Sequence, residues 1–218
     1  MKKFAVIGLG NFGFHTAKAL YEDGNEVIAI DSDRNVIQDI GPYATEAIVM
    51  DATDKAALKT LGLESMDGVV VATGTNISNS LLICLYLQEM GVKRILAKAV
   101  DEDHEKILKR VGATEIIHPE RDIAYRVARS LSKPNLLDFI PLAEGFELVE
   151  IGPPREFISK SLRELNLRAR YNVYVVAVQE TVPENFVFVP SADFVLKDSD
   201  VMIMLGRTED IDRIKGLE

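Results

Sequence analysis

A glycine-rich segment between an apolar run and an amphipathic stretch constrains the fold more than any other feature. The run Phe4–Ile7 leads into Gly8, Gly10 and Gly13, and Asp31 stands eighteen residues beyond Gly13. The spacing G-x-G-x-x-G alone is weak evidence. Placed after a predicted strand and before a predicted helix, with an acid about 20 residues further on, it indicates a dinucleotide-binding unit.

Each glycine has a separate expected role. Gly8 permits a tight turn, Gly10 lets backbone N–H groups approach a diphosphate, and Gly13 lets the helix pack against the strand. Asn11 and Phe12 lie between them and are further candidates for cofactor contact. The alternative is that the glycines serve packing alone.

Short apolar runs alternate with segments of helical periodicity over residues 1–134, which predicts a Rossmann-like, doubly wound parallel sheet. Ligands of such sheets bind beyond the carboxyl ends of the strands. The predicted strands are Phe4–Ile7, Val27–Ile30, Ala47–Met50, Val69–Ala72, Ile95–Ala97 and Ile116–Ile117.

A second, smaller domain follows a break at Lys133-Pro134-Asn135. We expect a linker over 135–142 and an α+β domain over 143–218 that pairs with a copy of itself, since about 75 residues bury little apolar surface alone. Its predicted strands are Glu147–Ile151, Val173–Gln179, Phe186–Val189 and Val201–Leu205, with a short helix over Ser161–Leu165 and a closing helix over Asp210–Ile214.

The residues after the second strand predict ribose recognition. Asp31, with Ser32 beside it, suits a free ribose 2′-hydroxyl and disfavours a 2′-phosphate by charge repulsion. Arg34 weakens that exclusion, because an arginine can receive a 2′-phosphate. Asp33 is predicted to be a helix N-cap.

Polar and small residues also follow the third strand. Asp51 is a candidate to accept from an adenine amino group, with Ala52 and Thr53 beside it in the site. Thr53 or Asp54 is expected to cap the next helix.

After the fourth strand, Ala72, Thr73 and Gly74 leave room for a nucleotide across the strand ends. Thr73 and Asn76 offer hydrogen bonds to it. Turn chemistry explains the same composition, so both interpretations stay open.

Two charged residues complete the candidate site. Lys98 follows the fifth strand and would meet a phosphate or a ribose, or else lie solvated on the surface. Glu120 is the candidate metal ligand, for magnesium at the nucleotide phosphates, or else a first-turn acid that answers the helix dipole. His104 is expected to be solvated, and Cys84 to be a small buried hydrophobe.

Composition excludes several classes of protein. A net charge of −9 argues against nucleic acid as a partner. The longest apolar stretch, Leu81–Leu87, is much shorter than the ~20 residues of a membrane span, and the N-terminus has no signal-peptide pattern.

Catalytic motifs are absent from the sequence, which contains no Ser/His/Asp order, no HExxH and no Cys or His pairs at metal-binding spacing. An NAD-dependent oxidoreductase and a redox-sensing repressor are the alternatives to a pure binding protein.

The sequence resembles the KTN/RCK regulatory proteins of Trk/Ktr-type potassium uptake over essentially its whole length. The motifs that carry the resemblance are Gly8-Leu9-Gly10-Asn11-Phe12-Gly13, Asp51-Ala52-Thr53, Ala72-Thr73-Gly74, Ile117-His118-Pro119-Glu120 and Leu165-Asn166-Leu167-Arg168-Ala169-Arg170-Tyr171.

The resemblance implies a non-enzymatic gating subunit that binds an adenine nucleotide, either NAD/NADH or ATP/ADP. It implies a homodimer assembled into an octameric ring, cytoplasmic and peripheral at the inner face of the membrane, on a potassium-translocating membrane subunit. It also implies that Leu136–Leu142 crosses to the dimer partner.

The chain departs from the family pattern at Asn11, where members that discriminate ATP from ADP often carry arginine. A dinucleotide or ADP-like ligand therefore stays open. The resemblance also implies a second ligand site at the C-terminal dimer seam, for a cyclic dinucleotide in some members. Asn166, Arg168 and Arg170 lie in the matching stretch, and a solvated polar edge is their alternative role.

Overall fold

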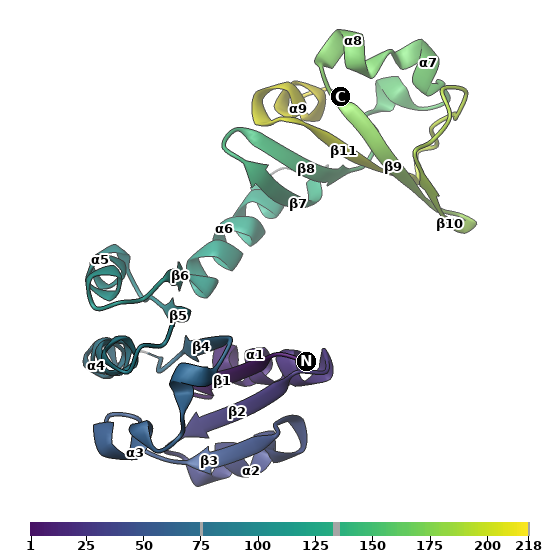
Figure 1. The fold of residues 1–218 in the computed structure, drawn as a ribbon. Coiled ribbons are helices and arrows are strands. Elements are labelled where there is room, and N and C mark those ends of the chain that lie inside the picture. The colour runs from purple at the N-terminus through teal and green to yellow at the C-terminus, as the bar shows by residue number, and fades with distance from the viewer. Residues whose placement is uncertain (75, 133–135, 218) are drawn as a thin grey trace. The chain divides into compact units, whose positions relative to one another are not determined.

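The computed structural model describes residues 1–74, 76–132 and 136–217 (Figure 1). The chain divides into two compact units, Met1–Arg121 and Asp122–Glu218. The division falls within helix α6 (Pro119–Ser132). Each unit has its own sheet and its own hydrophobic core. The boundary predicted at residue 134 falls among residues 133–135, outside the described residues.

The first unit is a parallel sheet of strand order β3-β2-β1-β4-β5-β6. This confirms the predicted Rossmann-like doubly wound sheet. The strands are β1 (Lys3–Ile7), β2 (Glu26–Asp31), β3 (Glu46–Val49), β4 (Gly68–Val71), β5 (Ile95–Lys98) and β6 (Glu115–Ile117). The α-helices between them are α1 (Asn11–Glu22), α2 (Arg34–Ile40), α3 (Lys55–Lys59), α4 (Ile77–Glu89) and α5 (Glu102–Arg110).

Both faces of this sheet are covered, which explains why its strands read as continuous apolar runs. Successive side chains of β1 point to opposite faces, so Val6 joins the cluster under α1 and α2, and Ala5 and Ile7 join the other. That second cluster includes Leu58 of α3, Ile83 of α4 and Leu108 of α5. The strand ends are thereby left as the accessible edge of the unit.

The second unit is an antiparallel sheet of order β10-β9-β11-β8-β7. Its strands are β7 (Leu136–Ala143), β8 (Phe146–Ile151), β9 (Tyr174–Thr181), β10 (Glu184–Phe188) and β11 (Val201–Arg207). Its α-helices are α7 (Leu162–Leu165), α8 (Leu167–Tyr171) and α9 (Thr208–Lys215). Strand β7 lies in the segment predicted as a linker and pairs with β8. Sheet structure therefore begins earlier in the chain than expected.

Local sequence explains the short helices of this unit. Ser161 and Glu164 form a capping box at the start of α7, which confirms the helix predicted there. Helix α8 was not predicted, and it is bracketed by Asn166 and Asn172, both in the left-handed conformation. Asparagine adopts that conformation more readily than most residues, so it can end one short helix and begin the next.

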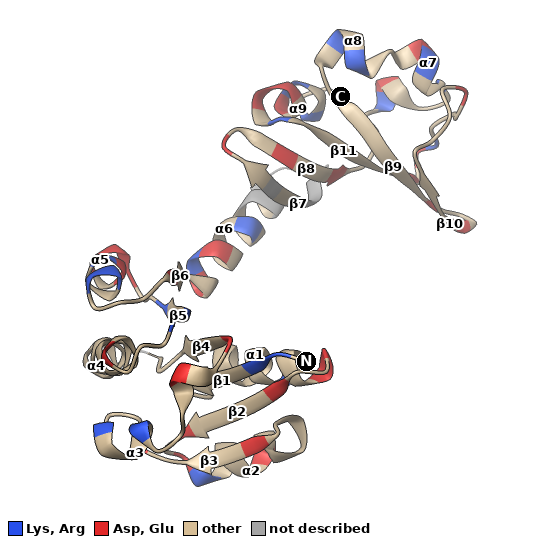
Figure 2. Ribbon diagram, viewed as in Figure 1, with Lys and Arg blue, Asp and Glu red and all other residues tan. Residues whose placement is uncertain are grey.

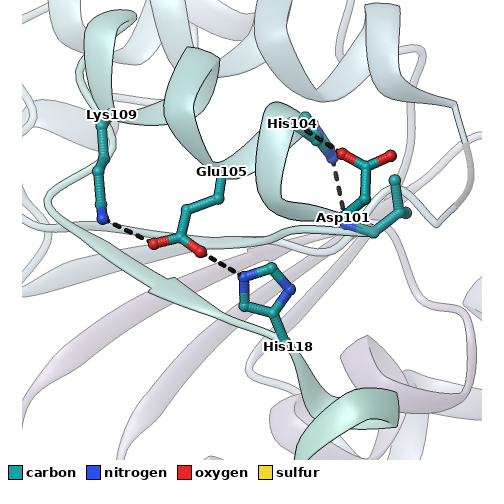
Figure 3. Close-up of polar contacts among 6 residues, drawn as sticks. Asp101, His104, Glu105, Lys109 and His118 are labelled. Carbon is teal, nitrogen blue, oxygen red and sulfur yellow. Dashed lines mark hydrogen bonds and ion pairs between the residues drawn. The ribbon is translucent and has the colours of Figure 1, made fainter.

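The expectation of a solvated His104 is wrong, because the residue is only 2% exposed. Its Nε2 lies 2.8 Å from the Ser80 hydroxyl, and its Nδ1 accepts from the Val100 N–H at 3.2 Å. Figure 3 shows His104 beside Asp101, which accepts from the His104 backbone N–H at 2.7 Å, whereas the Glu105 carboxylate lies between Lys109 and His118. Helix α5 carries charges of both signs (Figure 2), which concealed its buried face in the sequence.

Candidate functional site

A cavity of about 270 Å³ lies at the carboxyl ends of the strands in the first unit. It collects residues that follow β1, β2, β3 and β4 along the chain, as expected for this class of sheet. Its lining includes Ile7, Gly8, Gly10, Ile30, Asp31, Ser32, Met50, Asp51, Ala52, Thr53, Ala72, Thr73, Gly74, Asn79 and Ile83.

The three glycines of the loop meet different surroundings. Gly8 has φ +88°, and a Cβ there would lie 2.7 Å from the Ala72 backbone. A Cβ on Gly13 would lie 1.9 Å from the Gly8 carbonyl oxygen, so only glycine lets α1 approach this closely. A Cβ on Gly10 would meet nothing within 4 Å. Gly8 and Gly13 are required by packing, whereas Gly10 borders open space in the cavity.

Asp31 ends β2 and fixes two backbone groups. Its Oδ2 accepts from the Leu9 N–H at 2.6 Å, and its Oδ1 accepts from the Asp33 N–H at 2.9 Å. Asp33 caps α2 by accepting from the Asn35 N–H, which confirms its predicted role. A carboxylate oxygen has two lone pairs, so Asp31 retains acceptor capacity toward the cavity.

Asp51 is ordered by the threonine two residues on. Its Oδ1 accepts from the Thr53 backbone N–H at 2.9 Å and from the Thr53 hydroxyl at 2.7 Å. These bonds, the side-chain one above all, lower the pKa of Asp51 and keep it a carboxylate acceptor. Asp54 caps α3, as the sequence predicted for one of the two residues.

Thr73 carries an unsatisfied hydroxyl at the cavity wall. Its Oγ1 is buried and has no hydrogen-bond partner among the described residues. Buried polar groups are almost always paired, so an orphan that borders a cavity fits a missing ligand. Together with the open space at Gly10 and the carboxylates of Asp31 and Asp51, this lining fits a nucleotide.

Several predicted site residues lie outside the cavity lining. Asn11 begins α1 on the surface, and Phe12 is partly buried against the hydrophobic core. Asn76 caps α4 by accepting from the Asn79 N–H at 3.1 Å. Lys98 forms an ion pair with Glu120, which lowers the pKa of that carboxyl. Gly13 is also outside, buried beneath the loop.

The sequence analysis missed five apolar or amide contributors to the cavity, Ile7, Ile30, Met50, Asn79 and Ile83. The first three of these end predicted strands, so their places were foreseeable. Asn79 and Ile83 come from the helix that starts after β4, and only the three-dimensional packing turns them toward the site.

In the described ranges, no group of three or more His, Cys, Asp or Glu side chains is arranged to hold a metal ion.

The second unit has a cavity of similar size, about 270 Å³. Its lining residues come from α7, α8, β9 and the segment after β10, and they are Leu162, Asn166, Leu167, Arg168, Val173, Tyr174, Val175, Pro190 and Ala192. The guanidinium of Arg168 lies 5.3 Å from the Tyr174 ring centroid. Arg170 is not part of this lining and packs over the Tyr171 ring instead.

Fold and site define a class of nucleotide-binding proteins that join a Rossmann-type domain to a small antiparallel domain. The TrkA-N domain matches residues 4–119, and the TrkA-C domain matches residues 146–217. The chain belongs to the KTN/RCK (TrkA/KtrA-like) family of potassium-uptake proteins.

Curated relatives match along the whole chain. Ktr system potassium uptake protein C of Bacillus subtilis (strain 168) is 41% identical over 214 residues, which cover 98% of this chain and 96% of the relative. Ktr system potassium uptake protein A of the same organism is 36% identical over 99% of this chain and 96% of the relative.

Solved structures share the fold. The RCK domain of GsuK matches 99% of this chain with a TM-score of 0.68 and 15% identity, and this chain spans 48% of its length. The GsuK channel bound to NAD matches 98% of this chain with a TM-score of 0.52 and 20% identity, and this chain spans 38% of its length. Within residues 1–74, 76–132 and 136–217, every helix is too short or too polar to cross a bilayer.

Proposed function

We propose that this chain is a regulatory subunit of a Trk/Ktr-type potassium transporter that binds an adenine nucleotide and senses it without converting it. The observation that carries the proposal is the cavity at the strand ends, with the open approach at Gly10 and the unpaired Thr73 hydroxyl. The Ktr potassium uptake proteins that match the chain along its length support the transport role.

The ligand that the lining suits is an unphosphorylated adenosine ribose linked to a diphosphate, as in NAD, NADH or ADP. Asp31 accepts from the ribose hydroxyls, and the N-terminus of α1 faces the diphosphate. Asn11 supplies no positive charge for a terminal phosphate, so an ATP-specific response is not expected. When magnesium accompanies the phosphates, Glu120 is the candidate ligand for it.

Signal transfer requires two shapes of an assembly that bind the ligand unequally. A nucleotide shifts such an equilibrium only by its differential affinity for the two shapes. We propose a homodimer, assembled into an octameric ring on the cytoplasmic side of the membrane subunit. The sequence motifs that resemble the KTN/RCK family, together with the match to both TrkA domains, support this arrangement.

An apolar stripe on α6 supports the dimer. Ile123, Val127 and Leu131 recur at four-residue spacing and are 55%, 52% and 81% exposed. Exposed apolar stripes of this kind usually mark association surfaces. Sedimentation of Val127→Glu should show a lighter species than the unaltered chain, whereas Ile107→Glu on α5 should sediment unchanged.

Thermal unfolding with ATP, ADP, NAD or NADH tests the nucleotide proposal. A ligand that binds only the folded chain raises the unfolding temperature by mass action. We expect a rise with at least one diphosphate-containing nucleotide and no NAD-dependent oxidation of hydroxy substrates. Steady turnover would favour an NAD-dependent oxidoreductase instead, and a flat response to all four would refute nucleotide binding.

A second ligand in the C-terminal unit is a subordinate proposal. The cavity that contains Asn166 and Arg168 offers an amide, a guanidinium and the Tyr174 ring to a cyclic dinucleotide. Adding a cyclic dinucleotide to the same unfolding assay, with Arg168→Ala as the comparison, tests it.

A further inference from the structure

The ion pair between Lys98 and Glu120 joins two residues that sequence analysis assigned separately to the nucleotide site. Lys98 is the last residue of β5, and Glu120 is the second residue of α6. The Lys98 side chain is 13% exposed and the Glu120 side chain 70% exposed. The lysine is therefore the fixed, mostly buried partner, and the glutamate reaches to it from the surface.

Lys98 lies one strand away from the cavity wall. Val71 of β4 pairs with Ala97 of β5, so Lys98 stands level with Ala72, which lines the cavity. On its other side, Lys98 pairs with Ile117 of β6, three residues before Glu120. The lysine is thus between the nucleotide cavity and the strand that leads into α6.

The ion pair restricts when Glu120 could hold a magnesium ion, because Lys98 must first leave the carboxylate. A divalent cation on this carboxylate would approach the Lys98 ammonium, and like charges at such a distance repel. The cation that neutralises the Glu120 carboxylate in this structure is the Lys98 ammonium group.

We propose that Lys98 is a partner-exchange switch: its ammonium binds Glu120 in the free protein and transfers to a nucleotide phosphate when the cavity fills. This inference rests on the proposed nucleotide-binding function. A lysine ammonium binds phosphate as readily as carboxylate, so the exchange keeps its charge paired in both states. Glu120 is then released at the first turn of α6, the helix that continues beyond Arg121 into the second unit.

The test is a double-mutant cycle measured by titration calorimetry with ADP and with NADH, in EDTA so that no metal contributes. Glu120→Gln should tighten binding by about two- to fivefold, because Lys98 no longer has to leave an ion pair. Lys98→Met should weaken binding by about tenfold through loss of the phosphate contact. Glu120→Gln should have no further effect in the Lys98→Met background.

A matched control lies at the opposite end of the same two strands. Arg94 and Glu115 form an exposed ion pair at the amino ends of β5 and β6, and Glu115→Gln should leave the affinity unchanged. Lys98→Gln replaces Lys98→Met if the latter does not fold, as judged by circular dichroism.

The outcomes separate this switch from the function on which it rests. If the unaltered chain binds ADP or NADH and Glu120→Gln binds them equally or more weakly, the switch alone is overturned. If Glu120→Gln still tightens nucleotide binding in the Lys98→Met background, the switch is also overturned, because the loss of a negative charge would then explain the effect. Absence of binding by the unaltered chain overturns both proposals.

Discussion

The Oδ2 atom of Asp31 accepts a hydrogen bond from the Leu9 backbone N–H at 2.6 Å, so the end of β2 is tied directly to the glycine-rich loop. Asp31 also lines the cavity. One carboxylate therefore fixes the loop and faces the cavity in which we propose that the nucleotide binds. We expect ligand affinity and loop order to be coupled at this residue, so a substitution there should affect both.

Replacing Asp31 with alanine should weaken ADP or NADH binding by about 1–3 kcal/mol, through loss of hydrogen bonds to the ribose. The variant should also unfold at a lower temperature, because the Leu9 and Asp33 N–H groups lose their acceptor. Calorimetry and thermal unfolding measure the two effects. Asp54→Ala is the control: it removes a helix cap worth about 0.5–2 kcal/mol and should leave affinity unchanged. Unchanged affinity of the Asp31 variant would remove this residue from the site.

Gly10 and Gly13 should respond in opposite ways to added side chains. Gly10 has φ −61° and ψ −177°, which any residue adopts, and a Cβ there meets open space. Gly10→Val should therefore fold normally and lose nucleotide binding, because the branched side chain fills the diphosphate position. Gly13→Ala should lose stability, since its Cβ would lie 1.9 Å from a backbone oxygen. Unfolding temperatures and calorimetry on both variants check this contrast. Normal affinity in Gly10→Val would place the ligand elsewhere.

Thr73→Val tests whether the orphan hydroxyl serves a ligand. Valine has nearly the same shape and removes a buried polar atom that has no partner in the described part of the chain. The free protein should be as stable as before or slightly more stable. Nucleotide binding should weaken by about 0.5–1.5 kcal/mol, the value of one neutral hydrogen bond. Equal affinity in both proteins would assign Thr73 to turn geometry alone.

Much of the sheet and the cavity could be predicted because their determinants are local. Gly8, Gly10 and Asp31 are recognisable from spacing within one strand–helix–strand unit, and residues after consecutive parallel strands must meet at one edge. The N-caps at Asp33 and Asp54 depend on neighbours two or three residues away. Such features require no knowledge of the tertiary fold.

Features that depend on contacts between distant segments could not be predicted in this way. The Lys98–Glu120 pair requires that β5 and the start of α6 lie side by side, and neither residue alone indicates its partner. His104 sits in the sequence Glu102-Asp103-His104-Glu105, which reads as a solvated helix face. Its burial comes from packing of α5 against α4, where Ser80 supplies a polar partner.

Burial of His104 makes the stability of the first unit sensitive to pH. Nδ1 accepts from the Val100 N–H, so the neutral ring donates from Nε2 to Ser80 and both nitrogens are satisfied. Burial is the largest effect on His104 and lowers its pKa below the usual 6.5. The nearby Asp101 carboxylate raises the pKa and His118 lowers it, and the net pKa of His104 stays below its usual value. The unfolded chain therefore takes up a proton at a higher pH than the folded chain does. The free energy of unfolding should fall as the pH drops below about 6.5.

Denaturant unfolding of the unaltered chain and of His104→Gln between about pH 7.5 and pH 5.5 measures this effect. Glutamine can donate to Ser80 but does not titrate, so the variant should lose less stability over this range than the unaltered chain. His15→Gln is the matched control for the change from imidazole to amide, because His15 is exposed on α1. Equal slopes in the unaltered chain and His104→Gln would mean that the folded protein accepts the proton at His104 without cost. The hydrogen bond from Val100 would then have to be dispensable.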